Sequence, residues 1–393
     1  MMKRMKRFVQ GAMVVAAGLM VACSNGETDS TTADADSENV IRIGSMFELT
    51  GAAAEYGISM NDAVKMAVAE INDAGGVDGK TIEIIERDIA SDEAQASQAA
   101  LSLVADENVS TIIGPALTGT FQAAIPAANQ YEVPIISPSA TDDGVLQDDN
   151  GNVHPYAFRT SFTNSFQGGA LAQFANENLG ATKAIIFGDN SSDYAQGLTQ
   201  TFQDAFVGEI VSIENFTADQ TDFSATLTNI SDMDFDVLYL PGYYEQAGPI
   251  VKQAREMGID QPIVGPDGLG NTKMVDLAGS ENMNDVFYTS HFVVESDDPA
   301  IQTFVQNYKE FTGNDPDMFT GLAYDAVYIT KEAIERAGST EPKAVNAEIE
   351  NTEDFIGITG TYSFDEKHDP VKTVSIIEIQ NGDPVNIFEV NPE

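Results

Sequence analysis

Residues 110–144 contain two short apolar runs joined by one helical segment, and this arrangement constrains the fold more than any other part of the sequence. The runs Thr111–Gly114 and Val133–Ser137 are short and rich in β-branched residues, as buried strands are. Consecutive parallel strands need a crossover connection, usually a helix, and residues 120–131 supply one. The stretch therefore predicts a parallel α/β sheet.

Each of these two predicted strands breaks into small hydroxyl residues. Ligands of open parallel sheets bind outside the carboxyl ends of the strands. The turn Thr118–Thr120 also opens a helix, whose free N–H groups and positive dipole end favour an anion. We therefore expect Thr118, Ser139 and Thr141 to converge on a small carboxylate. The alternative is that these residues only cap helices and form turns.

The alternation of strand and helix extends over most of the chain in two runs of similar length. The first run begins at Val40–Met46, and the second restarts after Ser161. The last hundred or so residues contain too few strands for a third domain, so we expect them to complete both runs. The predicted fold class is α/β, with two doubly wound lobes. The predicted boundaries are 40–160 plus 292–364 for lobe 1, and 161–291 plus 365–393 for lobe 2.

The first 23 residues resemble a bacterial lipoprotein signal. Four basic residues precede the apolar run 8–21, and Cys23, the only cysteine, follows in the sequence LMVAC. We expect a signal peptide at 1–22, a lipid-modified Cys23 and a polar tether at 23–39. An extracytoplasmic protein, in the periplasm or at the cell surface, would then contact a membrane only through its lipid anchor. The alternative is an ordinary secretory signal with an unmodified cysteine.

The charge of the chain excludes two classes of partner. Four of its 19 Lys and Arg precede Cys23, whereas all 62 Asp and Glu follow it, so the mature chain would carry a formal net charge of −47. Nucleic acid and anionic membrane surfaces repel such a body. Concentrated salt screens this self-repulsion, because the Debye length falls to about 3 Å at 1 M. We therefore expect a saline or hypersaline medium, and equal thermal stability in low salt and in molar NaCl would contradict this expectation.

No catalytic or metal-binding motif stands out in the sequence. The three histidines, His154, His291 and His368, are far apart and form no ligand-spaced cluster. The nucleophile-elbow, zinc-protease, Walker and dinucleotide-binding patterns are all missing. We therefore expect a binding protein without cofactor or metal rather than an enzyme. The alternative is a hydrolase, which stays open only because carboxylate pairs are abundant in so acidic a chain.

Tyrosines and one acid are expected at turns that follow strands. Tyr56 falls in a loop before a helix predicted to start near Ser59, and Tyr194, Tyr243 and Asp267 follow later strands. A zwitterionic amino acid needs donors for its carboxylate, an anion for its ammonium group, and apolar or aromatic walls for its side chain. The hydroxyl residues, Asp267 and the tyrosines supply all three. The alternatives are a turn role for Asp267 and packing roles for the tyrosines.

Nine landmarks occur in a consistent order along the chain: GAAAEYG (51–57), AEINDAGGVDGK (69–80), Asp88, IIGPALTGTFQ (112–122), PIISPSAT (134–141), FRTSF (158–162), LPGYYEQAGPIVKQAREMG (240–258), VGPDG (264–268) and SFDEKHD (363–369). In these landmarks the sequence resembles the periplasmic leucine/isoleucine/valine-binding proteins, the type I solute-binding components of ABC importers. The resemblance runs from about Val40 to the C-terminus. It implies two α/β lobes joined by three crossings of the chain, which close on a ligand between them.

The resemblance also implies roles for individual residues. The carboxylate-binding hydroxyl of the family falls on Thr118 and its second hydroxyl contact on Thr141, while the carbonyl that meets the ammonium group falls on Ser139. The ammonium-binding acid, commonly Glu in the family, is here Asp267, which is one methylene shorter. The cysteine pair of some relatives is missing, and Leu117 stands at one of its positions. The predicted ligand-binding set is Tyr56, Ala116, Leu117, Thr118, Ser139, Ala140, Thr141, Tyr194, Tyr243 and Asp267.

We therefore expect a monomeric, lipid-anchored solute-binding protein that captures a small amino acid, most readily a branched-chain one, and delivers it to an ABC permease. Two alternatives stay open. The same fold could bind an amide, a urea or an aromatic acid, or the protein could present its ligand to a signalling partner as a sensor.

Overall fold

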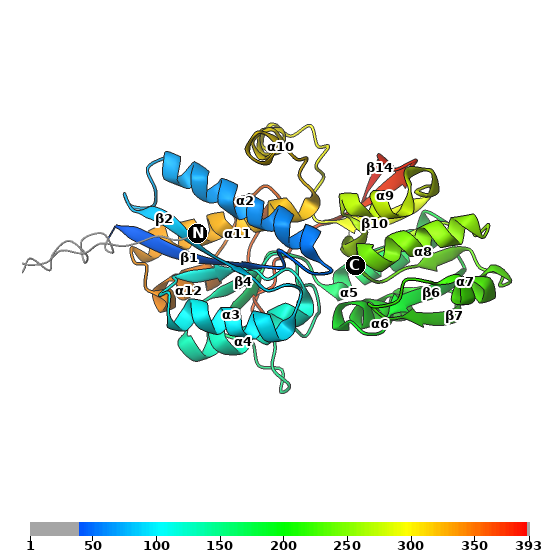
Figure 1. The fold of residues 1–393 in the computed structure, drawn as a ribbon, viewed down its shortest axis with the longest axis horizontal. Helices are drawn as coiled ribbons and strands as arrows, with labels where there is room; N and C mark the ends of the chain where they lie inside the picture. Colours follow the sequence, from blue (N-terminus) through cyan, green and yellow to red (C-terminus); the bar gives the residue numbers. More distant parts are fainter. Residues whose placement is uncertain (1–38, 391–393) are drawn as a thin grey trace, which may run out of the picture. The chain divides into compact units, whose positions relative to one another are not determined.

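The strands of this protein lie in two main sheets, which a computed structural model describes over residues 39–390 (Figure 1). The predicted signal peptide, the lipidation site Cys23 and the tether up to residue 38 lie outside the described residues. Among the described residues, no helix is both long and apolar enough to cross a bilayer.

The first sheet is entirely parallel and has the strand order β2-β1-β3-β4-β5. The strand order reverses between β1 and β3, which makes their carboxyl ends the expected place for a ligand. The strands are β1 (Val40–Phe47), β2 (Thr81–Asp88), β3 (Thr111–Ile113), β4 (Ile135–Ser137) and β5 (Ala157–Arg159).

The second sheet has the order β14-β13-β10-β9-β8-β6-β7. Its strands β6 to β10 are parallel, and the order reverses between β6 and β8. At the other edge β13 and β14 form an antiparallel hairpin. The strands are β6 (Lys183–Asp189), β7 (Glu209–Phe216), β8 (Val237–Tyr239), β9 (Ile263–Gly265), β10 (Val286–Ser290), β13 (Val374–Gln380) and β14 (Asp383–Val390). A separate two-stranded sheet pairs β11 (Phe355–Gly357) with β12 (Gly360–Tyr362).

Helices cover both faces of each main sheet (Figure 1). The first sheet lies between the pair α2 (Ala54–Asp73) and α11 (Met318–Ala337) and the pair α3 (Glu93–Ala105) and α4 (Thr118–Tyr131). The second lies between the pair α8 (Tyr244–Glu256) and α9 (Thr272–Ala278) and the pair α5 (Asn164–Glu177) and α6 (Asp193–Ala205). The remaining helices are α7 (Ser224–Ser231), α10 (Pro299–Thr312) and α12 (Pro342–Glu350).

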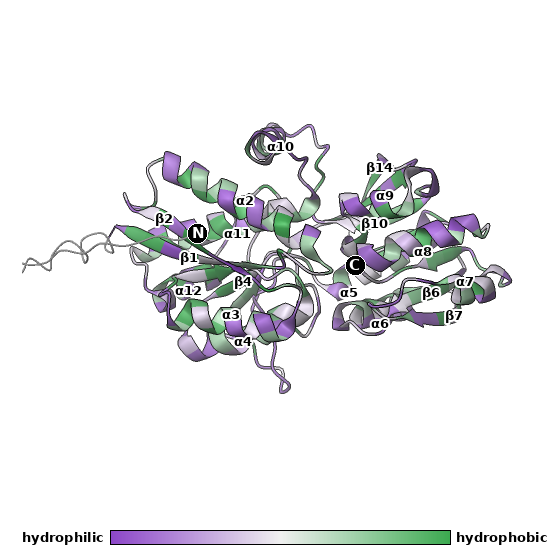
Figure 2. Cartoon of the chain, in the orientation of Figure 1, coloured by the Kyte–Doolittle hydropathy of each residue, from purple (hydrophilic) through white to green (hydrophobic). Residues whose placement is uncertain are grey.

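Successive strand residues enter different cores, because side chains alternate across a strand. Ile112 and Ile135 pack with α3 and α4, whereas Ile113 and Ile136 belong to the core that includes α2 and α11. Figure 2 shows the matching pattern on the helices, which carry hydrophobic residues on one side and hydrophilic residues on the other. Burial on both faces explains why the short strands are continuous apolar runs.

The chain passes between the two main sheets three times, as the family resemblance implied. The passages follow β5, follow β10, and join β12 to β13. The α/β class with two doubly wound parts is therefore confirmed, with one addition, the antiparallel edge of the second sheet. The lobe boundaries given above stay a prediction.

Two local predictions need correction. Helix α2 begins at Ala54 rather than near Ser59, so Tyr56 lies in its first turn and not in a loop. The alanine-rich stretch before Tyr56 has high helix propensity, which extends the helix toward the N-terminus. A short 3-10 helix, Asp267–Leu269, and helix α9 were not predicted, because they are too short to show helical periodicity.

Candidate ligand-binding site

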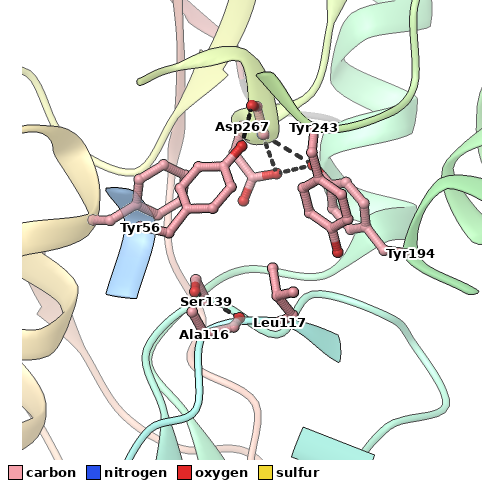
Figure 3. Close-up of a pocket in the computed structure, with 9 residues that line it drawn as sticks. Tyr56, Ala116, Leu117, Ser139, Tyr194, Tyr243 and Asp267 are labelled. Atoms are coloured by element: carbon pink, nitrogen blue, oxygen red, sulfur yellow. Dashed lines mark hydrogen bonds between the residues drawn. The ribbon is translucent and has the colours of Figure 1, made fainter. Parts of the chain in front are cut away.

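A pocket lies where the carboxyl ends of strands from both main sheets meet (Figure 3). We call Ala116, Leu117 and Ser139 the first wall, and Tyr194, Tyr243, Asp267 and Gly268 the second wall. Tyr56 and Phe319, from the first turns of α2 and α11, complete the lining. Both walls follow strands beside the reversals in strand order, where open α/β sheets bind ligands.

The buried acid Glu48, directly after β1, holds the first wall in place. Its carboxylate accepts hydrogen bonds from the N–H groups of Ala116 at 3.1 Å and Leu117 at 3.3 Å. It also accepts one from the Thr120 hydroxyl at 2.6 Å. Burial raises the pKa of Glu48, and the hydrogen bonds oppose that rise. The donors left for a ligand start at Thr118, where α4 begins and the N–H groups have no carbonyl one turn earlier.

Two buried hydroxyls beside the first wall have no hydrogen-bond partner among residues 39–390. They belong to Thr118, next to Leu117, and to Thr141, two residues after Ser139; the residues are 2% and 0% exposed. A buried polar group left unsatisfied costs about 1–3 kcal/mol. Such groups in a native structure therefore call for an explanation, and a bound ligand that accepts hydrogen bonds from these hydroxyls is one.

A buried ion pair fixes the turn that carries Ser139. The guanidinium of Arg159 donates to the carbonyls of Ala140 at 3.0 Å and Asp142 at 2.7 Å. Its Nε lies 2.5 Å from the carboxylate of Asp369, so the two landmarks FRTSF and SFDEKHD meet here. The Ser139 hydroxyl donates to the Ala116 carbonyl at 2.8 Å and ties the two halves of the first wall together.

The second wall combines stacked tyrosines with a carboxylate. The rings of Tyr194 and Tyr243 stack with their centroids 4.8 Å apart and an interplanar angle of 11°. The Tyr194 hydroxyl donates to Oδ1 of Asp267 at 2.5 Å, and the Gly268 N–H reaches the same oxygen at 3.0 Å. Burial raises the pKa of Tyr194 well above its ordinary value, with the nearby Asp267 charge adding to the rise, so this hydroxyl stays a donor.

The other carboxylate oxygen of Asp267 is bonded to a histidine that the sequence reasoning did not place in the site. Nε2 of His291, directly after β10, lies 2.9 Å from Oδ2 of Asp267. The imidazole ring stacks on Phe162, with the centroids 3.7 Å apart. Burial lowers the pKa of His291, although the hydrogen bond and charge of Asp267 work against that lowering.

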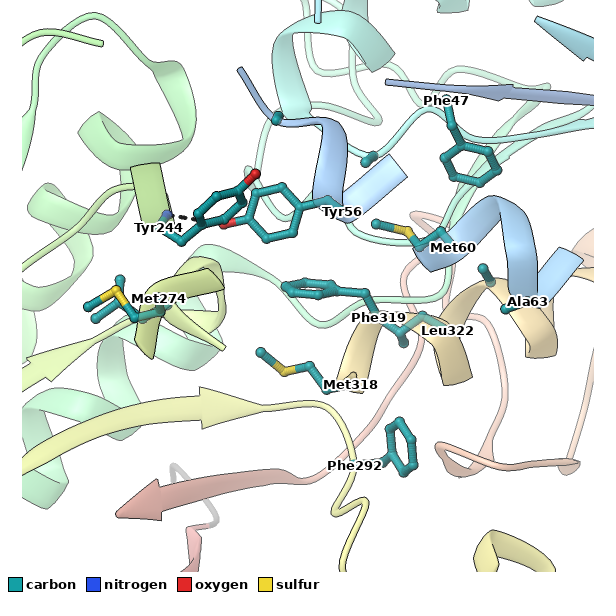
Figure 4. Close-up of a cluster of buried hydrophobic side chains, with 14 of the residues drawn as sticks. Phe47, Tyr56, Met60, Ala63, Tyr244, Met274, Phe292, Met318, Phe319 and Leu322 are labelled. Carbon is teal, nitrogen blue, oxygen red and sulfur yellow. Dashed lines mark hydrogen bonds between the residues drawn. The ribbon is translucent and has the colours of Figure 1, made fainter. Parts of the chain in front are cut away.

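Tyr56 connects the two walls. Its hydroxyl donates to the carbonyl of Gly268 at 2.5 Å and accepts from the N–H of Tyr244 at 3.3 Å. Its ring packs edge-on against Phe319, within the buried cluster drawn in Figure 4. Helix α2 comes this close only because residue 57 is glycine, since a Cβ there would lie 2.2 Å from the Glu48 carbonyl oxygen.

The structure brings most of the predicted set together. Tyr56, Ala116, Leu117, Ser139, Tyr194, Tyr243 and Asp267 all line the pocket. Thr118, Ala140 and Thr141 are buried beside it without lining it, and Ala140 uses its N–H and carbonyl within the protein.

Four residues of the site escaped sequence reasoning: Glu48, Gly268, Phe319 and His291. Glu48 and His291 had a usable signal, because each is a polar residue directly after a buried strand. Phe319 had none, since it reaches the pocket only through the packing of α11 against α2.

The chain is similar to known proteins over most of its length. The chain matches the family model described as periplasmic binding protein over residues 40–384. It is 29% identical over 337 residues to the leucine-, isoleucine-, valine-, threonine- and alanine-binding protein of Pseudomonas aeruginosa, covering 84% of this chain and 87% of that one. It is 28% identical to the leucine-specific-binding protein of Salmonella typhimurium, covering 91% and 93% of the two chains. The chain therefore belongs to the periplasmic binding protein family, whose members bind solutes.

Solved structures agree as well. The substrate-binding protein LivJ of a branched-chain amino acid transporter from Streptococcus pneumoniae, in complex with isoleucine, is 39% identical and superposes with a TM-score of 0.86, covering 90% of this chain and all of that one. A solute-binding protein from R. palustris in complex with benzoate is 22% identical, with a TM-score of 0.79 over 90% and 97% of the chains. At that identity, the second comparison shows the shared fold only.

Proposed function

We propose that this protein is the extracytoplasmic solute-binding component of an ABC importer and that it captures a branched-chain amino acid between two closing lobes. One observation carries the proposal: a pocket with a buried carboxylate in one wall has, beside the other wall, hydroxyls without a hydrogen-bond partner in the part of the chain that the structure describes. The ligand's ammonium group would meet Asp267 and the carbonyl of Ser139, and its carboxylate would meet Thr118 and Thr141. Relatives that bind leucine, isoleucine or valine support this assignment.

The proposed ligand side chain is aliphatic because the remaining lining is apolar. Ala116 and Leu117 offer methyl groups, and Tyr243 and Phe319 offer ring faces. None of these four side chains offers a charge to a ligand side chain, so charged amino acids would be buried without a partner at high cost.

A second candidate ligand is an aromatic acid. The observation that favours it is the ring content of the pocket, since Tyr56, Tyr194, Tyr243 and Phe319 all line it. An aromatic acid has no ammonium group, so it would leave the Asp267 carboxylate without a cationic partner. That difference separates the two candidates experimentally.

The test is a thermal-shift screen of the purified protein in molar NaCl, followed by calorimetry on any ligand that raises the melting temperature. A ligand that binds only the folded state stabilises it by about 2.7 kcal/mol at one hundred times its Kd. We expect leucine, isoleucine or valine to produce a shift and benzoate to produce none. A shift with aromatic acids alone would overturn the amino-acid assignment while leaving the family intact.

The membrane anchor belongs to the same proposal. Cys23 would carry the lipid and would be the first residue of the mature protein. Labelling of cells with a radioactive fatty acid should mark the wild-type protein and not Cys23→Ala. Equal labelling of both would refute the anchor.

We also propose that the protein works in a saline medium, because a chain with 62 acidic and 19 basic residues is suited to concentrated salt. The melting temperature should rise steeply between 0.1 M and 2 M NaCl. A flat response would speak against a saline habitat.

A further inference from the structure

We propose that His291 makes capture of an ammonium-bearing ligand pH-dependent, because its imidazole and the ligand's ammonium group share one oxygen of Asp267. The inference rests on the proposed function and deepens it. It assigns to His291 the role of a positioning residue whose protonation state sets the affinity for amino acids.

The hydrogen bonds around Asp267 identify the shared oxygen. A carboxylate offers about four acceptor positions, two on each oxygen. On Oδ1, Tyr194 and Gly268 supply two donors. On Oδ2, His291 supplies one. The one open position is therefore on Oδ2, beside the imidazole, and an ammonium group that binds Asp267 must donate there.

The neutral imidazole suits this arrangement. With its proton on Nε2 it donates to Oδ2 and holds the carboxylate in a fixed orientation, as the stacking on Phe162 holds the ring. Nδ1 is buried and has no partner among the described residues, so the neutral form leaves one buried acceptor without a hydrogen bond. The doubly protonated form would bury an unpartnered N–H together with a charge, which is the costlier state.

Protonation of His291 would oppose ligand binding for a direct electrostatic reason. The imidazolium would neutralise Asp267 and place a second positive charge next to the ligand's ammonium group. Linkage makes the effect reciprocal, so a bound ammonium group must lower the pKa of His291 further. A ligand with a carboxylate and no ammonium group would feel no such repulsion.

The charged and titratable groups around the ring are few. Asp267 faces it from the 3-10 helix, and Lys372, on the passage from β12 to β13, also acts on it and lowers its pKa. The neighbours from the segment before α5 and from α11 are Phe162 and Phe319, which do not titrate.

Burial also moves the pKa values of three other groups into the physiological pH range. It raises the pKa of Glu245 to about 7 and that of Asp317 to about 6, and it lowers the pKa of Lys372 to about 7. The experiment must separate these three from His291.

The experiment measures the Kd of the purified full chain for leucine by calorimetry in molar NaCl between pH 8 and pH 4.5. His291→Gln keeps an N–H donor for Asp267 and removes the titration, while Glu245, Asp317 and Lys372 remain. His368→Gln is the matched control, because His368 is also buried and stacked on a phenylalanine, with its centroid 4.2 Å from that of Phe158, but it does not contact Asp267. The second ligand is 4-methylpentanoate, which is leucine without its amino group.

We expect the Kd of the wild type and of His368→Gln for leucine to rise toward pH 4.5, and that of His291→Gln to rise at least threefold less. Binding of 4-methylpentanoate, counted per ionised ligand because its own carboxyl group is partly protonated at pH 4.5, should not weaken on acidification. The same pH dependence in all three proteins would overturn the inference and leave the proposed function standing. No binding of any branched-chain amino acid at pH 8 would overturn both.

A second measurement covers a His291→Gln protein that fails to fold. The imidazole of His291 in the wild type is titrated by NMR with and without leucine, and its pKa should fall on binding. An unchanged pKa contradicts the inference. In the protein alone the sign for stability is also fixed: because the folded-state pKa lies below the unfolded value of about 6.5, this group's stabilisation is present above that pH and is lost as the pH falls toward the folded pKa.

Discussion

The two walls of the pocket differ in what they offer a ligand. The first wall is built from Ala116, Leu117 and Ser139 on loops after β3 and β4, and hydroxyl donors lie beside it. The second wall holds two stacked tyrosines and the carboxylate of Asp267. Three hydrogen bonds from Tyr194, Gly268 and His291 fix the orientation of that carboxylate. The first side therefore provides hydroxyl donors and one carbonyl, whereas the second provides a charged acceptor and ring faces.

The difference indicates how a zwitterion would be recognised. Its negative end fits the hydroxyls beside the first wall, and its positive end needs Asp267 of the second wall in addition to the Ser139 carbonyl of the first, so neither wall alone satisfies both ends. Recognition then requires both walls at once, and ligand binding favours the state in which they are together. Substitutions on either side of the pocket test this division, and they differ in how strongly each should weaken binding.

The largest effect is expected at the acid of the second wall. Asp267→Asn should raise the Kd for leucine roughly a hundredfold or more, a loss of about 3 kcal/mol, because a buried ammonium group loses its charged partner. Calorimetry measures this value, with 4-methylpentanoate as the control ligand whose Kd should not rise. An unchanged Kd for leucine would mean that another acid binds the ammonium group.

The hydroxyls beside the first wall come next. Thr118→Val should raise the Kd for leucine about tenfold, since a hydrogen bond to a charged group contributes about 1.5–3 kcal/mol. The melting temperature of the protein alone should stay the same or rise, because the valine removes a buried hydroxyl that has no partner in the described chain.

Thr120→Val is the matched control for that substitution. The Thr120 hydroxyl is bonded to Glu48, so its loss should lower the melting temperature and affect the Kd less. The opposite ranking of the two variants would show that Thr120 and not Thr118 meets the carboxylate.

A smaller effect is expected where the walls are joined. Tyr56→Phe removes the bond to the Gly268 carbonyl and should raise the Kd about fivefold, which corresponds to about 1 kcal/mol. Tyr308→Phe is the control, because that hydroxyl bonds the Ser59 carbonyl instead. Equal effects of the two variants on the Kd would mean that the bridge does not contribute to binding.

The smallest effect is expected at Ser139. Its hydroxyl is already used within the first wall, and only its carbonyl is assigned to the ligand, so Ser139→Ala should change the Kd less than about threefold. A tenfold loss would place the hydroxyl itself on the ligand.

Local patterns were sufficient to predict much of this architecture, and their limits have physical causes. The residues after β3, β4, β6, β8 and β9 were found because short apolar runs end in polar residues at one edge of a parallel sheet. The hydrogen bonds of Glu48 and His291 were not predicted, since the sequence does not show which buried polar atoms bond each other when the residues are far apart in the chain. Tyr56 lines the pocket together with the other residues expected there, but its local structure was predicted wrongly, because alanines extend the helix beyond its predicted start.

The bond between Tyr56 and Gly268 joins positions 212 residues apart and lies at the edge of the pocket. A ligand held between the walls cannot leave until they separate, and separation breaks this bond, whereas entry into open walls does not involve it. The contact therefore acts on the dissociation rate and not on the association rate. It does so together with the bond from the Tyr244 hydroxyl to the Ala52 carbonyl, which also joins the two sides of the pocket, so the lifetime of a bound complex depends on tyrosine hydroxyls at the edge of the pocket as well as on the contacts with the ligand.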